Sequence, residues 1–454
     1  MVRGPHRRGF LDRRPGCRRR HGRARQDSDP VTALVVGLGR SGVALARFLR
    51  NRGDKVRVCD LKPAEKLREY ISKLPAGCDL HLGGYDESVL RGCDEVYASP
   101  GVPWNAPLLK QARLKGLTVS SEMDLFFRYC PAPIVGITGT NGKTTTTALT
   151  AQVLGRGRRP VLVGGNIGET VLDRLPAVTP DHWVVLELSS FQLETISRPR
   201  VHVAVVLNIT PDHLDRHGSF KAYVDSKARL VEHQGAGDYA VLNGRDETCR
   251  QLAQRTRAKV VWFDQHEPAP PMPIPGHHNL ENALAAAAVG RIAGLADEQI
   301  NEAVAGFEGV EHRLELVGKW NGVRWYNDSK ATNPDAGRVA LAAFAGEPLV
   351  LIAGGHGSGF DLKQWVGEIK ERAAAVVLIG ESAGLLEKEL AGHPSLHRAR
   401  DLDHAVELAA ALAEPGGVVL LSPGYKSFDW FTSFEDRGRR FKDSVRRWNA
   451  RRTA

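Results

Sequence analysis

A chain of 454 residues, 42% of them apolar and 25% charged, is long enough for about three domains of ~150 residues and has the composition of a globular protein. No apolar run reaches the ~18 residues that a transmembrane helix needs, and six scattered cysteines without a C-x-x-C pair argue against a disulfide framework or a cysteine zinc site. The net charge of +10 does not indicate nucleic-acid binding, because ten arginines and three aspartates in residues 1–29 contribute +7 of it.

Residues 1–29 are predicted to form a disordered basic tail, since they lack the apolar segment of a secretory signal. An RNA-binding arm or a transit peptide is the alternative. Scattered thiols are typical of a reducing compartment, so we expect a cytoplasmic protein. We also expect a monomer with no membrane span and no nucleic-acid partner. Beyond the tail, the order of strands and helices predicts an α/β protein of three domains, at residues 30–121, 122–309 and 310–454.

The first predicted domain has the strand–helix–strand order of a Rossmann-like fold. An apolar run at 32–37 is expected to be a strand, a helical pattern covers Val43–Leu49, and a second strand covers Lys55–Asp60. Another short strand is predicted at Glu95–Ala98. These elements form a βαβ unit of a parallel sheet.

The turn after the first of these strands carries a complete G-x-G-x-x-G motif, formed by Gly37, Gly39 and Gly42, with Ser41 inside it. Asp60 closes the next strand. By itself this pattern predicts NAD, with the Asp60 carboxylate on a ribose hydroxyl. The same geometry accepts any nucleoside diphosphate, because it recognises the pyrophosphate and not the nicotinamide. A UDP-sugar is therefore equally compatible with the motif.

The strongest single motif is GITGTNGKT at residues 136–144, in the second predicted domain. It lies between an apolar strand at Ile134–Ile137 and a helical pattern at Lys143–Leu154, so backbone N–H groups and a helix N-terminus can bind phosphate. Lys143 would reach the β- and γ-phosphates, and the Thr144 hydroxyl can ligate Mg²⁺. The alternative is a glycine-rich turn with a surface lysine. The strand–loop–helix context favours a central P-loop ATPase-type parallel sheet.

Two polar residues follow apolar strands of the same domain. Glu187 comes near the end of the strand Trp183–Leu188, where a carboxylate beside a phosphate loop suits Mg²⁺. His213 follows the apolar run Val201–Leu207 and is a candidate second metal ligand or charge stabiliser. Alone, a strand-end glutamate or a loop histidine is more often a solvated side chain. Lys227 has the pattern of an exposed helical lysine.

The third predicted domain is a second Rossmann-like α/β unit. Its strands are predicted at Val323–Trp325, Leu349–Ala353, Ala375–Ile379 and Val418–Leu421. The motif NDSKATN, at residues 327–333, comes directly after the first of them. Its hydroxyl groups and lysine suit phosphate and carboxylate binding, and a solvated loop is the alternative.

Seven motifs of this chain occur in the order seen in the Mur ligases: GITGTNGKT, ELSSFQLE, NITPDHLDRH, Y-x-x-x-K, GHHNLENALAA, EHRLE and NDSKATNPDA. Over most of its length the chain therefore resembles this family, and ELSSFQLE and NDSKATN resemble the members that add D-glutamate. The resemblance implies an ATP-dependent ligase of peptidoglycan synthesis, with UDP-N-acetylmuramoyl-L-alanine and D-glutamate as substrates. ATP would phosphorylate the alanyl carboxylate to an acyl phosphate, which the amine of glutamate then attacks.

The resemblance also implies roles for individual residues. The UDP-linked precursor would contact Gly37, Gly39, Ser41, Gly42, Asp60 and Asn166. ATP would contact Thr140, Asn141, Gly142, Lys143, Thr144, Thr145, Thr146, Asn279, Asn282, Arg313 and Asp328. One Mg²⁺ would be held by Thr144 and Glu187, and a second by His213 and Lys227, the latter as a carbamate. The amino acid would be bordered by Thr332, Ser427 and Phe434. The catalytic set would be Lys143, His213, Lys227 and Lys330.

Two departures from the family concern the amino-acid side of the site. The loop at 354–360 carries no lysine, and the run at 422–427 reads SPGYKS. We therefore predict that Lys426 supplies part of the missing charge for the distal carboxylate, and a Mur-type ligase for a different amino acid stays open. Two alternatives from other classes are a NAD-dependent oxidoreductase and a non-catalytic binding protein. The first does not explain the phosphate loop at residues 136–144, and the second does not explain Lys143, Lys227 and Lys330.

Overall fold

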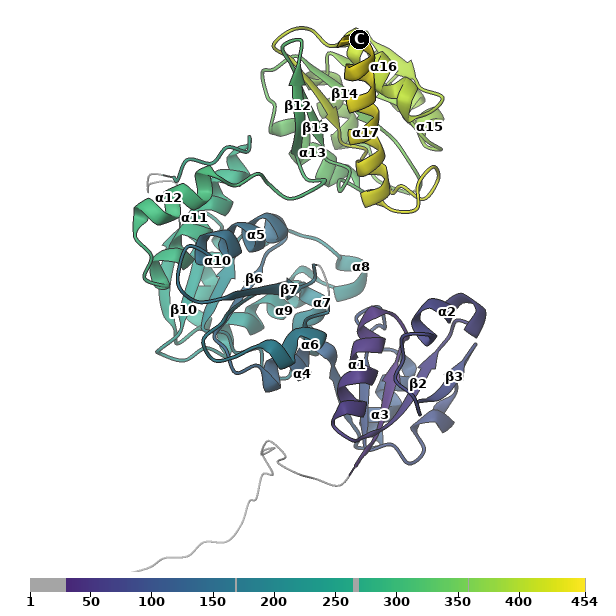
Figure 1. The fold of residues 1–454 in the computed structure, drawn as a ribbon, viewed down its shortest axis with the longest axis vertical. Helices are drawn as coiled ribbons and strands as arrows, with labels where there is room; N and C mark the ends of the chain where they lie inside the picture. Colours follow the sequence, from purple (N-terminus) through teal and green to yellow (C-terminus); the bar gives the residue numbers. More distant parts are fainter. Residues whose placement is uncertain (1–29, 168–169, 264–268, 358, 454) are drawn as a thin grey trace, which may run out of the picture.

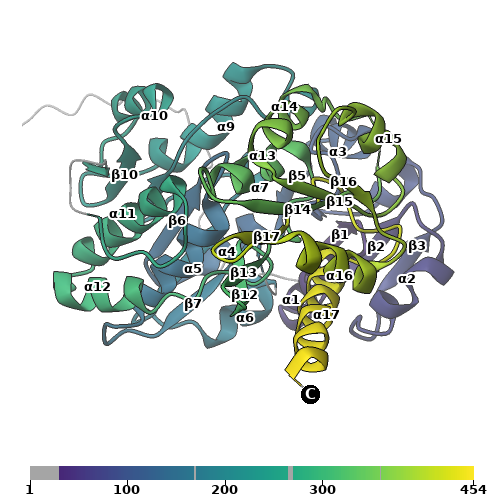
Figure 2. The same ribbon diagram turned by 90° about the horizontal axis from the view of Figure 1, so that it is seen from above.

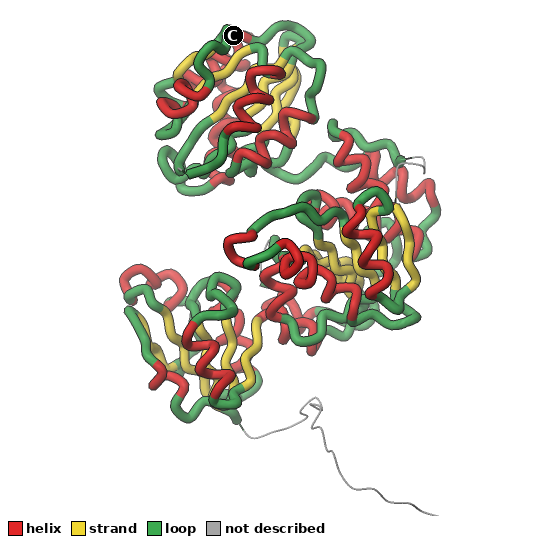
Figure 3. Tube along the Cα trace, turned by 180° about the vertical axis from the view of Figure 1, so that it is seen from behind, coloured by secondary structure: helices red, strands yellow, loops and turns green. Residues whose placement is uncertain are grey.

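The computed structural model describes residues 30–167, 170–263, 269–357 and 359–453. Three α/β units follow one another along the chain (Figure 1), and each unit, a β-sheet together with its helices, is called a layer below. In each layer the strands lie inside and helices cover them (Figure 3). The predicted α/β fold with three sheets is confirmed, and the boundaries between the domains stay predictions. The predicted tail at 1–29 lies outside the described residues. Among the described helices, none is both long and apolar enough to cross a bilayer.

The first sheet is fully parallel and has the order β3-β2-β1-β4-β5. Its strands are β1 (Thr32–Val36), β2 (Lys55–Asp60), β3 (Asp79–Leu82), β4 (Glu95–Ala98) and β5 (Thr118–Ser121). Its helices are α1 (Arg40–Asn51), α2 (Ala64–Ile71), the 3₁₀ turn η1 (Glu87–Leu90), α3 (Pro107–Leu114) and α4 (Glu122–Tyr129). Because β1 pairs with both β2 and β4, the strand order reverses there, which is where such sheets bind ligands.

The second sheet is also fully parallel, with the order β11-β10-β9-β6-β8-β7. Its strands are β6 (Ile134–Thr138), β7 (Val161–Gly165), β8 (Trp183–Glu187), β9 (Val203–Val206), β10 (Tyr239–Asn243) and β11 (Lys259–Phe263). Its helices and 3₁₀ turns are α5 (Lys143–Leu154), α6 (Val171–Arg174), η2 (Leu175–Ala177), α7 (Ser190–Thr195), α8 (Leu214–His217), α9 (Phe220–Glu232), α10 (Glu247–Leu252), η3 (Ala253–Arg255), α11 (His277–Ile292) and α12 (Asp297–Ala305). Since β6 lies between β8 and β9, the loops that follow these three strands meet at one edge.

The third sheet has the order β12-β13-β17-β14-β15-β16, and β12 alone runs antiparallel to its neighbour. Its strands are β12 (Glu315–Trp320), β13 (Val323–Asn327), β14 (Leu349–Ala353), β15 (Ala375–Leu378), β16 (Leu396–Arg398) and β17 (Val418–Leu421). Its helices are α13 (Pro334–Ala342), α14 (Lys363–Arg372), α15 (Ala383–Glu389), α16 (Leu402–Leu412) and α17 (Phe434–Thr453). Figure 2 shows α17, in yellow, beside α16 and extending beyond the sheet.

The first two layers share a hydrophobic core. Helices α1 and α4 both pack against α6, and the cluster joins buried residues such as Leu45, Phe126 and Leu172. The third sheet has a separate buried cluster on each face. The three strands of the third layer that the sequence placed at Leu349–Ala353, Ala375–Ile379 and Val418–Leu421 agree with β14, β15 and β17 to within one residue.

Candidate active site

A cavity of about 1690 Å³ lies between the three layers and is lined by residues from all of them. It brings together nine of the residues singled out from the sequence: Gly37, Gly39, Ser41, Asp60, Thr144, Asn166, Glu187, Lys330 and Phe434. The other predicted site residues do not line this cavity in the described part of the chain.

The glycine-rich turn after β1 is tightly packed and held by a carboxylate. Gly37 has φ +91°, and a Cβ at Gly42 would lie 2.2 Å from the Gly37 carbonyl oxygen, so neither position tolerates a side chain. Asp60 accepts hydrogen bonds from the N–H groups of Leu38 (2.7 Å) and Lys62 (2.8 Å). In this structure the Asp60 carboxylate therefore fixes the turn, and its predicted contact with a ribose stays a prediction.

The phosphate loop after β6 folds around its own lysine. The Lys143 ammonium donates to the carbonyl oxygens of Gly139 (3.0 Å) and Thr140 (2.7 Å). Burial lowers the pKa of Lys143, and the nearby Arg313 lowers it further, whereas the charge of Glu187 raises it. An anion bound in the loop would further stabilise the charged form of Lys143, whose hydrogen bonds here go to carbonyl oxygens.

Neighbouring asparagines hold the backbone of this loop. Asn208 accepts from the N–H groups of Thr140 and Asn141, each at 2.8 Å. Gly142 has φ +85°, and a Cβ there would lie 2.4 Å from the Asn282 side-chain oxygen. The loop conformation is thus specified by partners that the glycine pattern alone does not reveal.

Helix α11 is tied to the start of helix α5 through side chains. The Thr146 hydroxyl donates to Asn282 at 3.0 Å, and Asn282 in turn donates to Asn279 at 3.2 Å. Asn279 donates to the Pro275 carbonyl at 2.6 Å. Thr145 is buried in the same region. The four predicted nucleotide contacts therefore lie in one connected region next to the phosphate loop.

Glu187 has the features expected of a cation ligand. It is 2% exposed, and its Oε1 accepts from the Asn166 amide at 3.0 Å. Its other oxygen, Oε2, is buried and has no hydrogen-bond partner among the described residues. A buried carboxylate oxygen without a donor costs free energy that a bound cation would offset. With Thr144 lining the same cavity, the residues present fit the predicted Mg²⁺.

The interpretation of Lys227 as an exposed helical lysine was wrong. Its residue surface is 1% exposed, and its ammonium donates to the Gly139 carbonyl at 2.8 Å. It also lies 4.7 Å from the centroid of the Tyr223 ring. Burial holds the pKa of Lys227 well below its ordinary value, and the charge of Lys143 lowers it further. A lower pKa increases the fraction of neutral amine, which is the form that reacts with carbon dioxide.

His213 lies at the start of the single-turn helix α8, with an exposed side chain. Its backbone is left-handed, with φ +51°, and its ring centroid is 5.0 Å from that of Phe191. The preceding residue, Asp212, is a functional candidate that the sequence reasoning missed. Its charge raises the pKa of both Lys143 and Lys227, so it contributes to the same electrostatic environment.

The third layer contributes charged and hydroxyl groups around the NDSKATN motif. The Lys330 ammonium is 5.9 Å from the centroid of the Phe434 ring, and burial lowers its pKa, with Arg313 lowering it further. Ser427 is buried and Thr332 is half-buried. Arg313, Asp328, Thr332 and Ser427 do not line the cavity in the described part of the chain.

Asp328 is predicted to make stability depend on pH. It accepts from the Ser422 hydroxyl (2.8 Å) and the Leu314 N–H (3.2 Å), and burial raises its pKa from the ordinary 3.8 to about 7. Its contribution to stability is therefore complete below pH ~4 and lost as the pH rises through ~7, a loss of at most ~4 kcal/mol. The melting temperatures of the wild type and Asp328→Asn are compared without nucleotide. As the pH is raised from 4 to 8, the melting temperature of the wild type should decrease relative to that of Asp328→Asn. Parallel pH curves for the two proteins would contradict this assignment.

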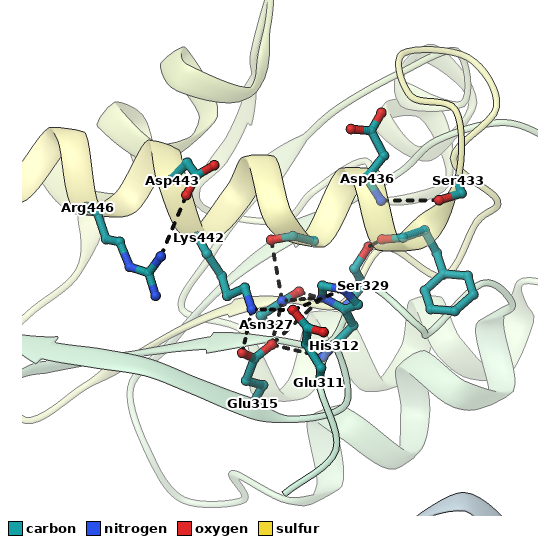
Figure 4. Close-up of polar contacts among 12 residues, drawn as sticks. Glu311, His312, Glu315, Asn327, Ser329, Ser433, Asp436, Lys442, Asp443 and Arg446 are labelled. Atoms are coloured by element: carbon teal, nitrogen blue, oxygen red, sulfur yellow. Dashed lines mark hydrogen bonds and ion pairs between the residues drawn. The ribbon is translucent and has the colours of Figure 1, made fainter. Parts of the chain in front are cut away.

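His312 is held between β13 and helix α17 (Figure 4). Its Nδ1 is 2.9 Å from the Asn327 amide nitrogen, and a Cβ at Gly438 would lie 2.2 Å from this ring nitrogen. Glu311, His312 and Glu315 have the spacing of metal ligands. However, the Lys442 ammonium already bonds both carboxylates, each at 2.7 Å, so an internal cation occupies this position.

Arg437 is a second residue that the sequence reasoning missed. It is fully buried, and its guanidinium donates to the Ser329 hydroxyl (2.9 Å), the Ser329 carbonyl (2.8 Å) and the Tyr425 carbonyl (3.0 Å). It thereby fixes the NDSKATN motif against the SPGYKS run. In the sequence, Arg437 is one of many arginines in α17, and its position alone does not distinguish it.

Three family profiles match the chain in series. They are described as the Mur ligase MurD-like N-terminal domain (residues 31–121), the Mur ligase middle domain (residues 137–271) and the Mur ligase glutamate ligase domain (residues 312–424). Among curated proteins, the chain is 44% identical over 440 residues to the UDP-N-acetylmuramoylalanine–D-glutamate ligase of Koribacter versatilis, covering 91% of this chain and 97% of that protein. The ligase of the same name from Solibacter usitatus is 44% identical, with the same coverage of both proteins.

Solved structures share the fold at much lower sequence identity. The UDP-N-acetylmuramate-alanine ligase MurC of Thermotoga maritima superposes with a TM-score of 0.58, at 21% identity, over 92% of this chain and 99% of that one. MurF of Acinetobacter baumannii gives a TM-score of 0.59, at 18% identity, over 87% of this chain and 90% of that one. These similarities concern the three-layer architecture alone.

Proposed function

The chain belongs to the Mur ligase family, and on that premise we propose that it is the ATP-dependent ligase that joins D-glutamate to UDP-N-acetylmuramoyl-L-alanine. The observation that carries this proposal is the single cavity to which all three layers contribute. A glycine-rich turn for a nucleoside diphosphate, the Thr144 and Glu187 pair, and Lys330 border the same space. A reaction between a UDP-linked carboxylate, ATP and an amine needs this convergence.

The proposed reaction proceeds through an acyl phosphate. The γ-phosphoryl group of ATP passes to the alanyl carboxylate, and ADP leaves. The amine of D-glutamate then attacks the acyl carbon, and phosphate leaves as the amide forms. Both steps gather negative charge, which Lys143 in the loop after β6 and Lys330 in the cavity wall would balance. Bound Mg²⁺ would add positive charge to the same region.

We propose two Mg²⁺ ions, as the resemblance implies. Thr144 and Glu187 would hold the first, supported by the unpartnered Glu187 oxygen. His213 and Lys227 would hold the second, with Lys227 as a carbamate. The depressed pKa of Lys227 supports this modification, because the neutral amine attacks carbon dioxide and loses a proton to give an anionic oxygen ligand. We further propose a cytoplasmic monomer.

A phosphate-release assay with UDP-N-acetylmuramoyl-L-alanine, ATP, Mg²⁺ and a panel of amino acids tests this function. Only D-glutamate should give strong turnover, with L-glutamate and D-aspartate as the close comparisons. Turnover with another amino acid would reassign the third layer and keep the ligase chemistry. If no amino acid stimulates phosphate release, the proposed function is refuted. Tight binding of NADH in place of ATP would instead favour the oxidoreductase alternative.

Lys426 is expected to affect the affinity for the amino acid. The exposed residue pairs through its backbone with His356, whose N–H donates to the Lys426 carbonyl at 2.7 Å. Ser358 of the same loop lies outside the described residues. Lys426→Ala should raise the KM for D-glutamate by about tenfold, the effect of losing one charged contact, and leave the KM for ATP unchanged. Lys388→Ala, at the exposed end of helix α15, is the control. An unchanged KM for D-glutamate would rule out this role.

A further inference from the structure

His217, at the end of helix α8, is enclosed by polar and aromatic partners that the proposed reaction does not use. Its side chain is 1% exposed. Its Nδ1 is 2.8 Å from a carboxylate oxygen of Glu194, and its Nε2 is 3.0 Å from the Ser190 hydroxyl. Since a carboxylate only accepts, Nδ1–H donates to Glu194 and Nε2 accepts from Ser190. Both partners lie on helix α7, four residues apart and therefore on one face.

Serine, histidine and glutamate in this order have the geometry of a hydrolase triad. However, Ser190 is 3% exposed and does not line the cavity in the described part of the chain. Its hydroxyl has no access to a substrate there and cannot serve as a nucleophile. Ser190 and Glu194 therefore fix the position of the His217 ring, and its role follows from the residues that the ring contacts.

The His217 ring also joins the segments that carry the proposed metal ligands. It stacks on Phe191, with centroids 5.3 Å apart and planes 11° apart, and Phe191 also contacts the His213 ring. On another side it meets the edge of Tyr223 at 5.2 Å. Tyr223 lies under the Lys227 ammonium, and its hydroxyl is 3.1 Å from the Thr140 hydroxyl of the phosphate loop.

The backbone provides a direct connection from His217 to His213. The N–H of His217 donates to the His213 carbonyl at 3.0 Å, closing the single turn of α8. His213 keeps a left-handed backbone that costs a non-glycine residue about 1–3 kcal/mol and persists only when its surroundings enforce it. Gly218, with φ +77°, ends the turn on the other side. The anchored His217 ring is one of the contacts that hold this short, exposed turn, and the Arg216 guanidinium over the Phe191 ring is another.

We propose that His217 is a positioning residue, which Ser190 and Glu194 hold against Phe191 so that His213 and Lys227 keep the spacing needed to share a divalent cation. This inference rests on the proposed function for the identity of the cation site. Residues that position metal ligands typically change metal affinity by about 10–100-fold when mutated, although they do not touch the metal. The inference predicts an effect of this kind for His217.

Mn²⁺ binding, measured by electron paramagnetic resonance of the free ion with ADP present and without precursor or amino acid, tests the proposal. In His217→Phe and Glu194→Ala, the affinity for one of two bound Mn²⁺ ions should fall about tenfold. Glu194→Gln retains an oxygen that accepts from Nδ1–H and should stay within about threefold of the wild type. In turnover, the Mg²⁺ concentration for half-maximal rate should rise while the KM for the UDP-linked precursor stays unchanged.

His393→Phe is the control, because His393 is likewise held by a hydrogen bond, to the Ala373 carbonyl at 3.0 Å, but belongs to the third layer. ADP affinity without divalent cation should be equal in all variants, which shows that the phosphate loop is intact. Wild-type Mn²⁺ affinity in His217→Phe and Glu194→Ala would overturn the proposal. So would an equal loss in His393→Phe. Because this binding is measured without turnover, failure of D-glutamate ligation in the wild type would refute only the proposed function.

Discussion

Lys143→Ala should lower the rate of D-glutamate-dependent phosphate release by at least about 10²–10³-fold, the effect of removing one preorganised donor at a site of developing negative charge. Its ammonium lies within the phosphate loop, bonded to the Gly139 and Thr140 carbonyls, and is ready to turn to a bound phosphate. The measurement is the steady-state rate at saturating substrates, with nucleotide affinity determined separately by calorimetry. Loss of rate should exceed loss of affinity, since the charge grows during transfer.

Lys221→Ala is the matched control for this substitution. Lys221 lies in the same layer, and its side chain is 84% exposed and pairs with Asp225. Its removal should leave the rate within about twofold, because an exposed ion pair contributes little. Near-wild-type activity in Lys143→Ala would overturn the assignment of residues 136–144 as the phosphate-binding loop.

Glu187→Gln is expected to have a comparably large effect through the cation. The substitution keeps the shape of the side chain, so Asn166 can still be accommodated, but it removes the charge behind the unpartnered oxygen. We expect the rate to fall at least about 10²-fold and one Mn²⁺ site to be lost in a direct binding measurement. Because the wild-type oxygen is buried without a donor, the melting temperature without metal should stay the same or rise.

Glu232→Gln serves as the control for Glu187→Gln, as Glu232 pairs with Arg255 on an exposed part of the same layer. It should bind Mn²⁺ and turn over as the wild type does. Retained activity in Glu187→Gln, or two intact Mn²⁺ sites, would contradict the role of this strand-end carboxylate.

Much of this architecture could be predicted from the sequence because the relevant signals are local. Apolar runs bounded by turns predicted the first and last residues of β2, β4 and β14 correctly. Glycines at positive φ, such as Gly37 and Gly142, lie in the two turns that are predicted to bind nucleotides. Strand ends in a parallel sheet converge by geometry, so Glu187 could be expected near the phosphate loop. These inferences need only periodicity and chain direction.

Burial and partner choice could not be predicted in the same way. Lys227 has the local pattern of a surface lysine, and only the packing of α9 against the loop after β6 encloses it. Arg437 and His217 acquire their roles from residues far away in the chain or on other helices. A single sequence does not specify which of its many arginines and histidines meet such partners, because these contacts form only when separate elements pack.

Gly438 in helix α17 connects the packing of this helix to the wall of the cavity. The helix can lie against His312 only because position 438 lacks a side chain, and the same helix begins with Phe434 at the cavity. Even a methyl group at position 438 would collide with the His312 ring, and a shift of the helix to relieve the collision would also move Phe434 at the cavity wall. Inactivating changes are therefore to be expected at Gly438, one helical turn beyond Phe434 at the cavity wall.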